Sequence, residues 1–161
     1  MRVFALAALT AVSAGSAALQ PAQFVPAAGW HTRVGKVHAC PGVPASRCVQ
    51  VFSVASTTPW RDCVGCLPHR TVAAMRAGDI AIQVNVARER RPQAGPAWPP
   101  HVTRRKVVAG FEGLPGRIGT FQAYSRIGKR EVLLFIVFGR SRPTDQQLQR
   151  ANAELSRVRF G

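Results

Sequence analysis

One unbroken apolar run, from Val132 to Phe138, constrains the fold of this chain more than any other feature outside its N-terminus. The run is too short for an ordinary helix and is rich in Val, Ile and Phe, which favours a β-strand. It does not alternate between apolar and polar residues, as a strand with one solvated face would. The sequence therefore predicts a central strand whose two faces are both covered.

The residues on either side of this run predict a strand–turn–strand–helix unit. Gly128 and Lys129 precede it in a pattern typical of a two-residue hairpin turn, because glycine readily accepts a positive φ. After it, Thr144 and Gln147 form a capping-box pattern at the start of a helix that is expected to extend from Thr144 to Arg157. Apolar residues recur at helical spacing in this segment, so the helix is expected to cover one face of the sheet: Leu148, Ala151, Leu155 and Val158.

The earlier part of the chain predicts further strands and one short helix. Strands are expected near residues 30–34, 47–55 and 79–87, the last because apolar residues alternate with Gln83 and Asn85. A short helix is expected from Pro68 to Ala77, with proline in its first turn and Gly78 as its stop. This strand–helix–strand order leaves open a crossover to a parallel pairing.

Two more strands, over residues 102–111 and 118–127, lead into the central strand and end the chain as a meander followed by a helix. Adjacent strands joined by short turns favour antiparallel pairing. The expected fold is therefore α+β, a single domain with a mostly antiparallel sheet of five or six strands. A contact between two copies of the chain is expected if the short helix leaves the second face of the central strand uncovered.

The first 18 residues are typical of a signal peptide. Arg2 is followed by an apolar stretch and then by small residues up to Ala18. An uncleaved N-terminal anchor is the alternative, because the stretch from Val3 to Leu19 is near the lower length limit for a membrane span. Residues 19–29 are rich in Pro and Ala and predict a linker, which leaves 30–161 for the folded domain. We therefore expect a secreted or extracytoplasmic protein of the cell envelope.

The charge of the chain is strongly one-sided: 22 Lys and Arg residues against 7 Asp and Glu residues, a net charge of +15 over 161 residues. A GC-rich genome can explain Arg in place of Lys, but not the scarcity of carboxylates. A positive field attracts an anionic polymer, a lipid surface or an acidic protein. The predicted anion-binding patch lies in and after a basic, proline-rich region and consists of Arg88, Arg90, Arg91, Arg104, Arg105 and Lys106. The alternative is that these residues only form a solvated charged loop.

The four cysteines are Cys40, Cys48, Cys63 and Cys66. An even number in an exported chain favours disulfides, and we favour the local pairs Cys40–Cys48 and Cys63–Cys66 over a crossed pairing. The C-x-x-C pattern before a helix also allows a thiol–disulfide activity. The cysteines with nearby histidines allow a zinc site, although their spacing matches no standard zinc motif and an oxidising compartment argues against one. We expect no metal and no other cofactor.

Motifs for common enzyme chemistry are missing from the sequence. It contains no G-x-S-x-G, no H-E-x-x-H and no P-loop, and its few carboxylates suggest no acid–base pair. Trp30, Trp60 and Trp98 fall in expected loops, where they pack in small cores or stack on sugar rings or lipids. The sequence thus predicts a non-enzymatic binding or structural module for an anionic envelope component or an acidic partner. The alternative is a thiol–disulfide or zinc-dependent activity at Cys63 and Cys66.

Overall fold

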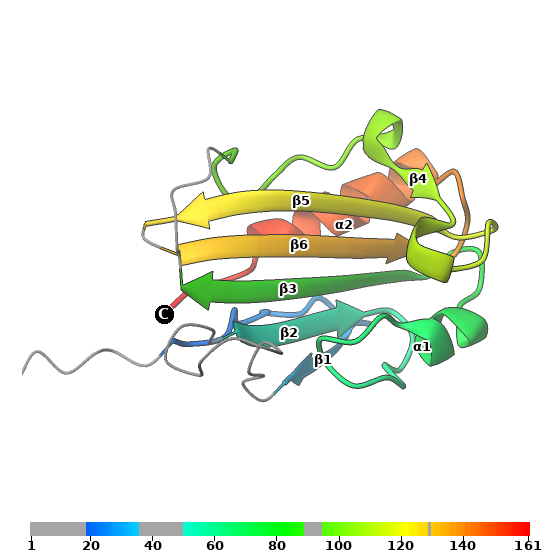
Figure 1. Cartoon of the computed structure of the whole chain (residues 1–161). Coiled ribbons are helices and arrows are strands. Elements are labelled where there is room, and N and C mark those ends of the chain that lie inside the picture. The colour runs from blue at the N-terminus through cyan, green and yellow to red at the C-terminus, as the bar shows by residue number, and fades with distance from the viewer. Residues whose placement is uncertain (1–18, 36–49, 89–94, 129) are drawn as a thin grey trace, which may run out of the picture.

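The computed structural model describes residues 19–35, 50–88, 95–128 and 130–161, and its framework is one six-stranded sheet (Figure 1). The strand order is β1-β2-β3-β6-β5-β4, and every neighbouring pair is antiparallel. The strands are β1 (His31–Val34), β2 (Gln50–Ser56), β3 (Ile80–Arg88), β4 (Val108–Ala109), β5 (Gly119–Ile127) and β6 (Arg130–Phe138). The described residues also form helices α1 (His69–Ala74) and α2 (Asp145–Ser156) and the 3-10 turns η1 (Arg104–Lys106) and η2 (Phe111–Gly113). The predicted α+β class is confirmed.

The apolar run lies in β6, at the centre of the sheet. β6 pairs along its whole length with β3 on one side and β5 on the other. Four side chains of β6 are 0% exposed on one face and form the main core with alternate residues of β3: Val132, Leu134, Ile136 and Phe138. On the opposite face Phe135 and Val137 are buried as well, whereas Leu133 is only partly buried. The central strand was correctly predicted, but part of its second face is open.

The hairpin and the helix predicted around β6 are both confirmed. Ile127 pairs with Arg130, so two residues connect β5 to β6, and Gly128 has a φ of 56°. At the start of α2, the Thr144 hydroxyl accepts the Gln147 N–H at 3.2 Å, and the Gln147 side chain accepts the Thr144 N–H at 3.0 Å. The apolar stripe of α2 packs into the main core through Leu148, Ala151 and Leu155.

We call the face of the sheet under α2 the closed face, because three segments cover it: α2, residues 19–30 and residues 95–107. Ala22 is 0% exposed, and the backbones of Gln23 and Arg159 exchange two hydrogen bonds of 2.8 Å. The ring of Trp98 packs edge-on against Phe160, with centroids 5.1 Å apart. The segment expected to be a linker, residues 19–29, therefore packs in its described part as a component of the domain.

The other face, which we call the open face, is covered at one end by α1 and the loop before it. The side chains of Trp60, Val72 and Met75 are buried there in a second core. The helix predicted from Pro68 to Ala77 is shorter, since it begins at His69 and ends at Ala74. The physical reason is that the Asp79 carboxylate accepts the Arg76 N–H at 2.7 Å, which turns the chain toward β3 before the helix can continue.

The crossover that the sequence left open does not form, because β2 and β3 pair antiparallel although α1 lies between them. One expectation about strands is wrong: residues 102–111 do not form one strand but contain η1, the two-residue β4 and the start of η2. The side chain of Asn152 on α2 takes the place of a strand partner: its Oδ1 accepts the Val102 N–H at 2.9 Å, and its Nδ2 donates to the Val102 carbonyl oxygen at 3.1 Å. The start of this segment therefore follows the helix, and the chain joins the sheet edge only at β4.

Several predicted features lie outside the described residues: the signal peptide, Cys40, Cys48, Arg90 and Arg91. In the part of the chain that the structure describes, no helix is long and apolar enough to cross a membrane.

Candidate functional site

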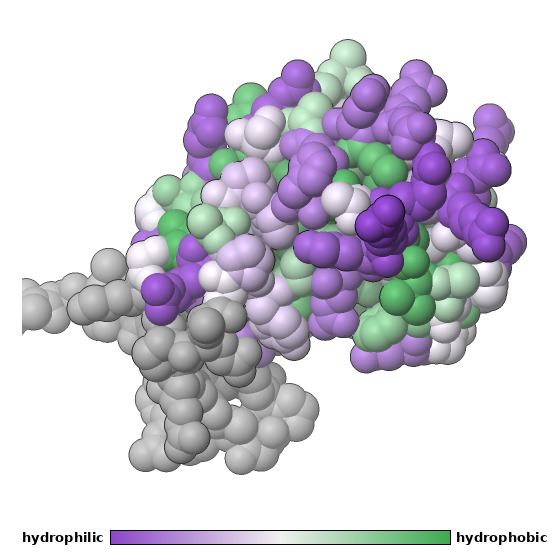
Figure 2. All heavy atoms as spheres, turned by 90° about the horizontal axis from the view of Figure 1, so that it is seen from above, coloured by the Kyte–Doolittle hydropathy of each residue, from purple (hydrophilic) through white to green (hydrophobic). Residues whose placement is uncertain are grey.

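Positively charged side chains gather at the end of the sheet where β6 finishes. Four of them are exposed and make no ion pair or hydrogen bond to any other described residue: Arg105 and Lys106 of η1, and Arg140 and Arg142 of the loop after β6. The two segments are adjacent, because an added Cβ at Gly119 would lie within 3 Å of both Val107 and the Arg140 carbonyl oxygen. We call these four residues the basic end. Figure 2 shows hydrophilic side chains concentrated over this half of the molecule.

Arg104 has a different role from its two neighbours in η1. Its guanidinium Nη2 pairs with Asp145 at 2.7 Å, and its Nε donates to the Pro143 carbonyl oxygen at 3.2 Å. A 3-10 turn has three residues per turn, so consecutive side chains point in different directions. Arg104 therefore fastens η1 to the start of α2, while Arg105 and Lys106 are directed elsewhere.

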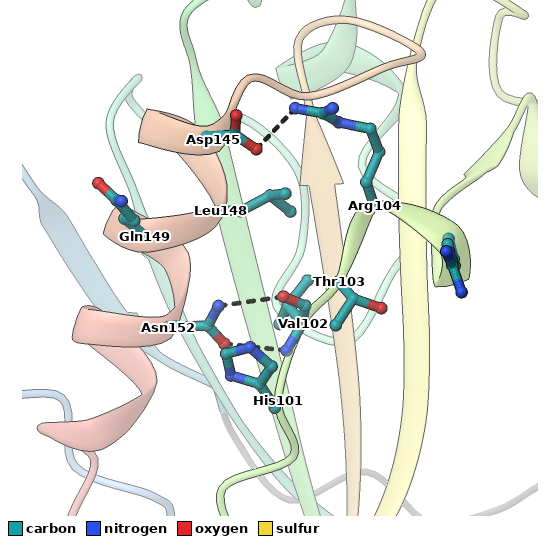
Figure 3. Close-up of a pocket in the computed structure, with 9 residues that line it drawn as sticks. His101, Val102, Thr103, Arg104, Asp145, Leu148, Gln149 and Asn152 are labelled. Atoms are coloured by element: carbon teal, nitrogen blue, oxygen red, sulfur yellow. Dashed lines mark hydrogen bonds and ion pairs between the residues drawn. The ribbon is translucent and has the colours of Figure 1, made fainter.

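An open groove of about 700 Å³ runs between α2 and the segment before η1 (Figure 3). The Arg104–Asp145 pair closes one end, and the two hydrogen bonds between Asn152 and Val102 cross it further along. Its remaining polar lining includes His101, Arg105 and Gln149. Because its single carboxylate is already paired with Arg104, the unpaired charge next to this groove is positive.

The structure separates the members of the predicted anion-binding patch. Arg104, Arg105 and Lys106 lie together in η1. Arg88 ends β3 and pairs with Arg130, whereas the opposite end of β3 pairs with Phe138 beside the basic end. Arg88 and η1 thus belong to opposite ends of the sheet. Arg140 and Arg142, which sequence reasoning did not select, are the residues that join Arg105 and Lys106.

The C-x-x-C segment forms a tight turn on the open face. Cys63 and Cys66 lie at disulfide distance, with their Cα atoms 5.3 Å apart, and both residues are exposed. The Cys66 N–H donates to the Cys63 carbonyl oxygen at 3.1 Å, and Gly65 has a φ of 94°. An added Cβ at Gly65 would meet the ring of Phe52 at 3.1 Å, so glycine is required by both conformation and space.

A second hollow, of about 200 Å³, lies beside this turn, and we call it the trough. Its floor is formed by Gln83 of β3, Leu133 and Phe135 of β6, and Gln122 of β5. One wall is the cysteine turn and the other is η2; the wall residues are Gly65, Cys66, Leu67, Phe111 and Glu112. Three strands and two loops thus build one small site.

The wall formed by η2 has an unusual backbone. Glu112 adopts a left-handed conformation, with φ 46° and ψ 47°, which costs an ordinary residue roughly 1 kcal/mol or more. Gly110 and Gly113 on either side also have positive φ, but glycine bears no such cost. A glutamate at this place therefore suggests that its side chain, at the rim of the trough, has a use.

The histidines and cysteines do not combine into a metal site within the described ranges. No group of three or more His, Cys, Asp or Glu side chains is close enough there to hold a metal ion. His31, His69 and His101 are exposed and lie in separate elements. The tryptophans are largely packing residues: Trp60 is buried, and Trp30 and Trp98 pack against the main core.

Two carboxylates among the described residues have shifted pKa values: that of Glu154 is raised and that of Asp62 is lowered. Burial raises the pKa of Glu154, and its contacts with the Ala27 N–H at 3.4 Å and Arg157 at 3.6 Å only partly offset this. For Asp62, burial also raises the pKa, but hydrogen bonds from Thr71 and Arg70 outweigh it and the net pKa lies below its usual range. Both groups hold segments in place, Asp62 at the start of α1 and Glu154 beneath residues 19–30.

Sequence reasoning missed the residues that form the trough. The two-residue hairpin places Gln122 of β5 opposite Phe135, but nothing local shows that Gln83 of β3 would flank the same phenylalanine on its other side. A further local signal was the glycine-rich stretch around Glu112, which predicts a turn but not its position over the sheet.

Comparison with protein-family models, with curated proteins and with solved structures found no match.

Proposed function

We propose that this protein is an exported, non-enzymatic binding module that engages an anionic component of the cell envelope through its basic end. One observation carries the proposal: two separate loops bring Arg105, Lys106, Arg140 and Arg142 to one end of the sheet, exposed and without a described acidic partner. A closely spaced set of unpaired cations binds a polyanion by releasing its counterions. The contacts of Arg104 with Asp145 and Pro143 support it, because they hold η1, which carries Arg105 and Lys106, beside the loop that carries Arg140 and Arg142.

The test is binding to polyphosphate and to vesicles that contain anionic lipid, measured over a range of salt concentrations. Replacing Arg105, Lys106, Arg140 and Arg142 by Ala is expected to weaken binding at least tenfold at low salt. The slope of log K against log salt should become shallower by up to about 1 for each cation that contacts the ligand.

The matched control removes the same charge from other exposed positions: Arg61, Arg70, Arg150 and Arg159. If only net charge matters, the two quadruple variants will lose the same affinity, and the proposal of a localised site is wrong. If the protein binds an acidic protein but neither polyphosphate nor the anionic vesicles, its partner is instead a protein surface.

The second candidate is a thiol–disulfide activity at Cys63 and Cys66. The exposure of both cysteines favours it, because an attacking thiolate can reach either sulfur. The exchange would reduce this pair to two thiols while a substrate dithiol is oxidised to a disulfide. Replacing both cysteines by Ser distinguishes the cases: an exchange activity would be abolished with the fold intact, whereas a structural pair would lower stability without any exchange activity to lose.

A further inference from the structure

The trough differs in charge from the rest of the molecule. None of the nine described residues that line it is Lys or Arg, although the chain contains 22 of them. Its one charged lining residue is the exposed Glu112. A polyanion that is attracted to the basic end would find no counter-charge here. The lining of the trough therefore favours a ligand that is neutral or carries a positive group.

The floor presents hydrogen-bonding groups on both sides of an apolar centre. Gln83 and Gln122 are the direct cross-strand partners of Phe135, so all three side chains emerge on the open face in one row. The Gln83 Oε1 atom accepts the Gly65 N–H at 3.3 Å, which leaves the Nε2 group of Gln83 to donate. The exposed Gln122 carboxamide can both donate and accept.

The apolar part of the trough is a corner between two rings. Phe111 of η2 and Phe135 of β6 have centroids 5.9 Å apart and planes tilted by 46°. The trough volume of about 200 Å³ corresponds to about seven water molecules. This space suits one six-membered ring that has an apolar face and polar groups around its edge.

We propose that the trough binds one ring of a neutral carbohydrate. The C–H face of the sugar would pack in the corner of Phe111 and Phe135, and its hydroxyl groups would bond Gln83, Gln122 and Glu112. A purely apolar ligand is disfavoured, because it would desolvate two carboxamides without replacing their hydrogen bonds. The proposal goes beyond anion binding, since it uses another face and another chemistry.

The open face continues from the trough toward Tyr124. This residue pairs with Leu133, a floor residue, so its ring lies in the next row on the same face. It is 46% exposed, one of the more exposed large hydrophobic side chains among the described residues. Tyr124 therefore offers a platform for a second sugar ring, which extends the inference from a monosaccharide to a short glycan.

The test is an NMR titration of the full exported protein with methyl glucoside, N-acetylglucosamine and the disaccharide of N-acetylglucosamine. We expect shifts of the backbone amides at Gln83, Gln122 and Leu133, with a Kd on the order of 1 mM for a ring of about a dozen heavy atoms. The Q83A/Q122A variant should weaken binding at least tenfold. Tyr124→Ala should leave monosaccharide affinity unchanged and weaken the disaccharide about threefold.

Two controls separate this inference from the anion-binding proposal. The quadruple variant of the basic end should bind these sugars as the wild type does, and glucuronate should bind no better than methyl glucoside. If none of the neutral sugars shifts the trough amides, the inference is wrong. It is also wrong if a folded Q122A variant and the double variant keep full affinity. Shifts that depend on protein concentration alone would show that a second copy of the chain occupies this face.

Discussion

The two faces of the sheet use the same strands for different purposes. On the closed face, the even-numbered residues of β6 and β3 are 0% exposed and are all apolar, from Ile80 to Val86 and from Val132 to Phe138. On the open face, Gln83 of β3 emerges in one row with Phe135 and with Gln122 of β5, and Tyr124 of β5 lies in the next row. Neighbouring residues of one strand point to opposite faces, so one side chain packs in the main core while the next can be exposed on the open face. The closed face carries the main core, whereas the open face carries the second core at one end and partly exposed polar side chains beside it.

The largest expected effect compares two neighbouring leucines of β6. Leu134→Ala should lower the free energy of unfolding by about 3 kcal/mol, because it leaves a cavity in a fully buried core. Leu133→Ala, on the open face, should cost about 1 kcal/mol, since this side chain is only partly buried. Urea unfolding followed by circular dichroism measures both. Equal losses would contradict the distinction between the faces.

The second-largest expected effect concerns the cysteine turn, which forms one wall of the trough. Replacing Cys63 and Cys66 by Ser should lower the free energy of unfolding by about 2 kcal/mol, the value for a bridge that closes a very short loop. It should also weaken sugar binding, because the Gly65 N–H that holds Gln83 is no longer fixed. Adding a reductant to the wild type should reproduce both losses. A serine variant with unchanged stability would show that the pair does not support the open face.

The smallest effect tests the buried carboxylate on the closed face. Because burial raises the pKa of Glu154, its favourable contribution is complete below the ordinary value of 4.5 and is lost as pH rises through the folded-state pKa. One oxygen of Glu154 is buried without a hydrogen-bond partner among the described residues. The E154Q variant should therefore gain about 1 kcal/mol relative to the wild type between pH 4 and pH 8.

Asp62 supplies the matched control with the opposite sign. Its pKa is lowered by hydrogen bonds, so its contribution is present above the ordinary value of 3.8 and is lost as pH falls through the folded-state pKa. The D62N variant should be less stable than the wild type at pH 8, and the difference should shrink in acid. Urea unfolding at a series of pH values measures both variants. Parallel pH profiles for E154Q and the wild type would contradict the assignment to Glu154.

The predictions from sequence succeeded where the signal was local and strong. The capping box of Thr144 and Gln147, the two-residue hairpin and the alternation of β3 each depend on residues within one turn or one strand. They failed where a distant side chain decided the backbone path. The segment before η1 has a strand-like pattern, but Asn152 of α2 bonds the Val102 backbone that a strand partner would have used.

The sequence by itself determined the centre of this protein, because a seven-residue apolar stretch that is too short for an ordinary helix must be covered as a strand. It also determined the excess of positive charge, which is a property of composition. Only the tertiary structure decided where that charge is unpaired, since Arg104 lies beside Asp145 while Arg105 does not. It also decided that Gln83, Phe135 and Gln122 form one row. The two-residue hairpin places Gln122 opposite Phe135, but Gln83 joins that row only because β3 pairs with β6, and no local pattern brings together two strands so far apart in the sequence.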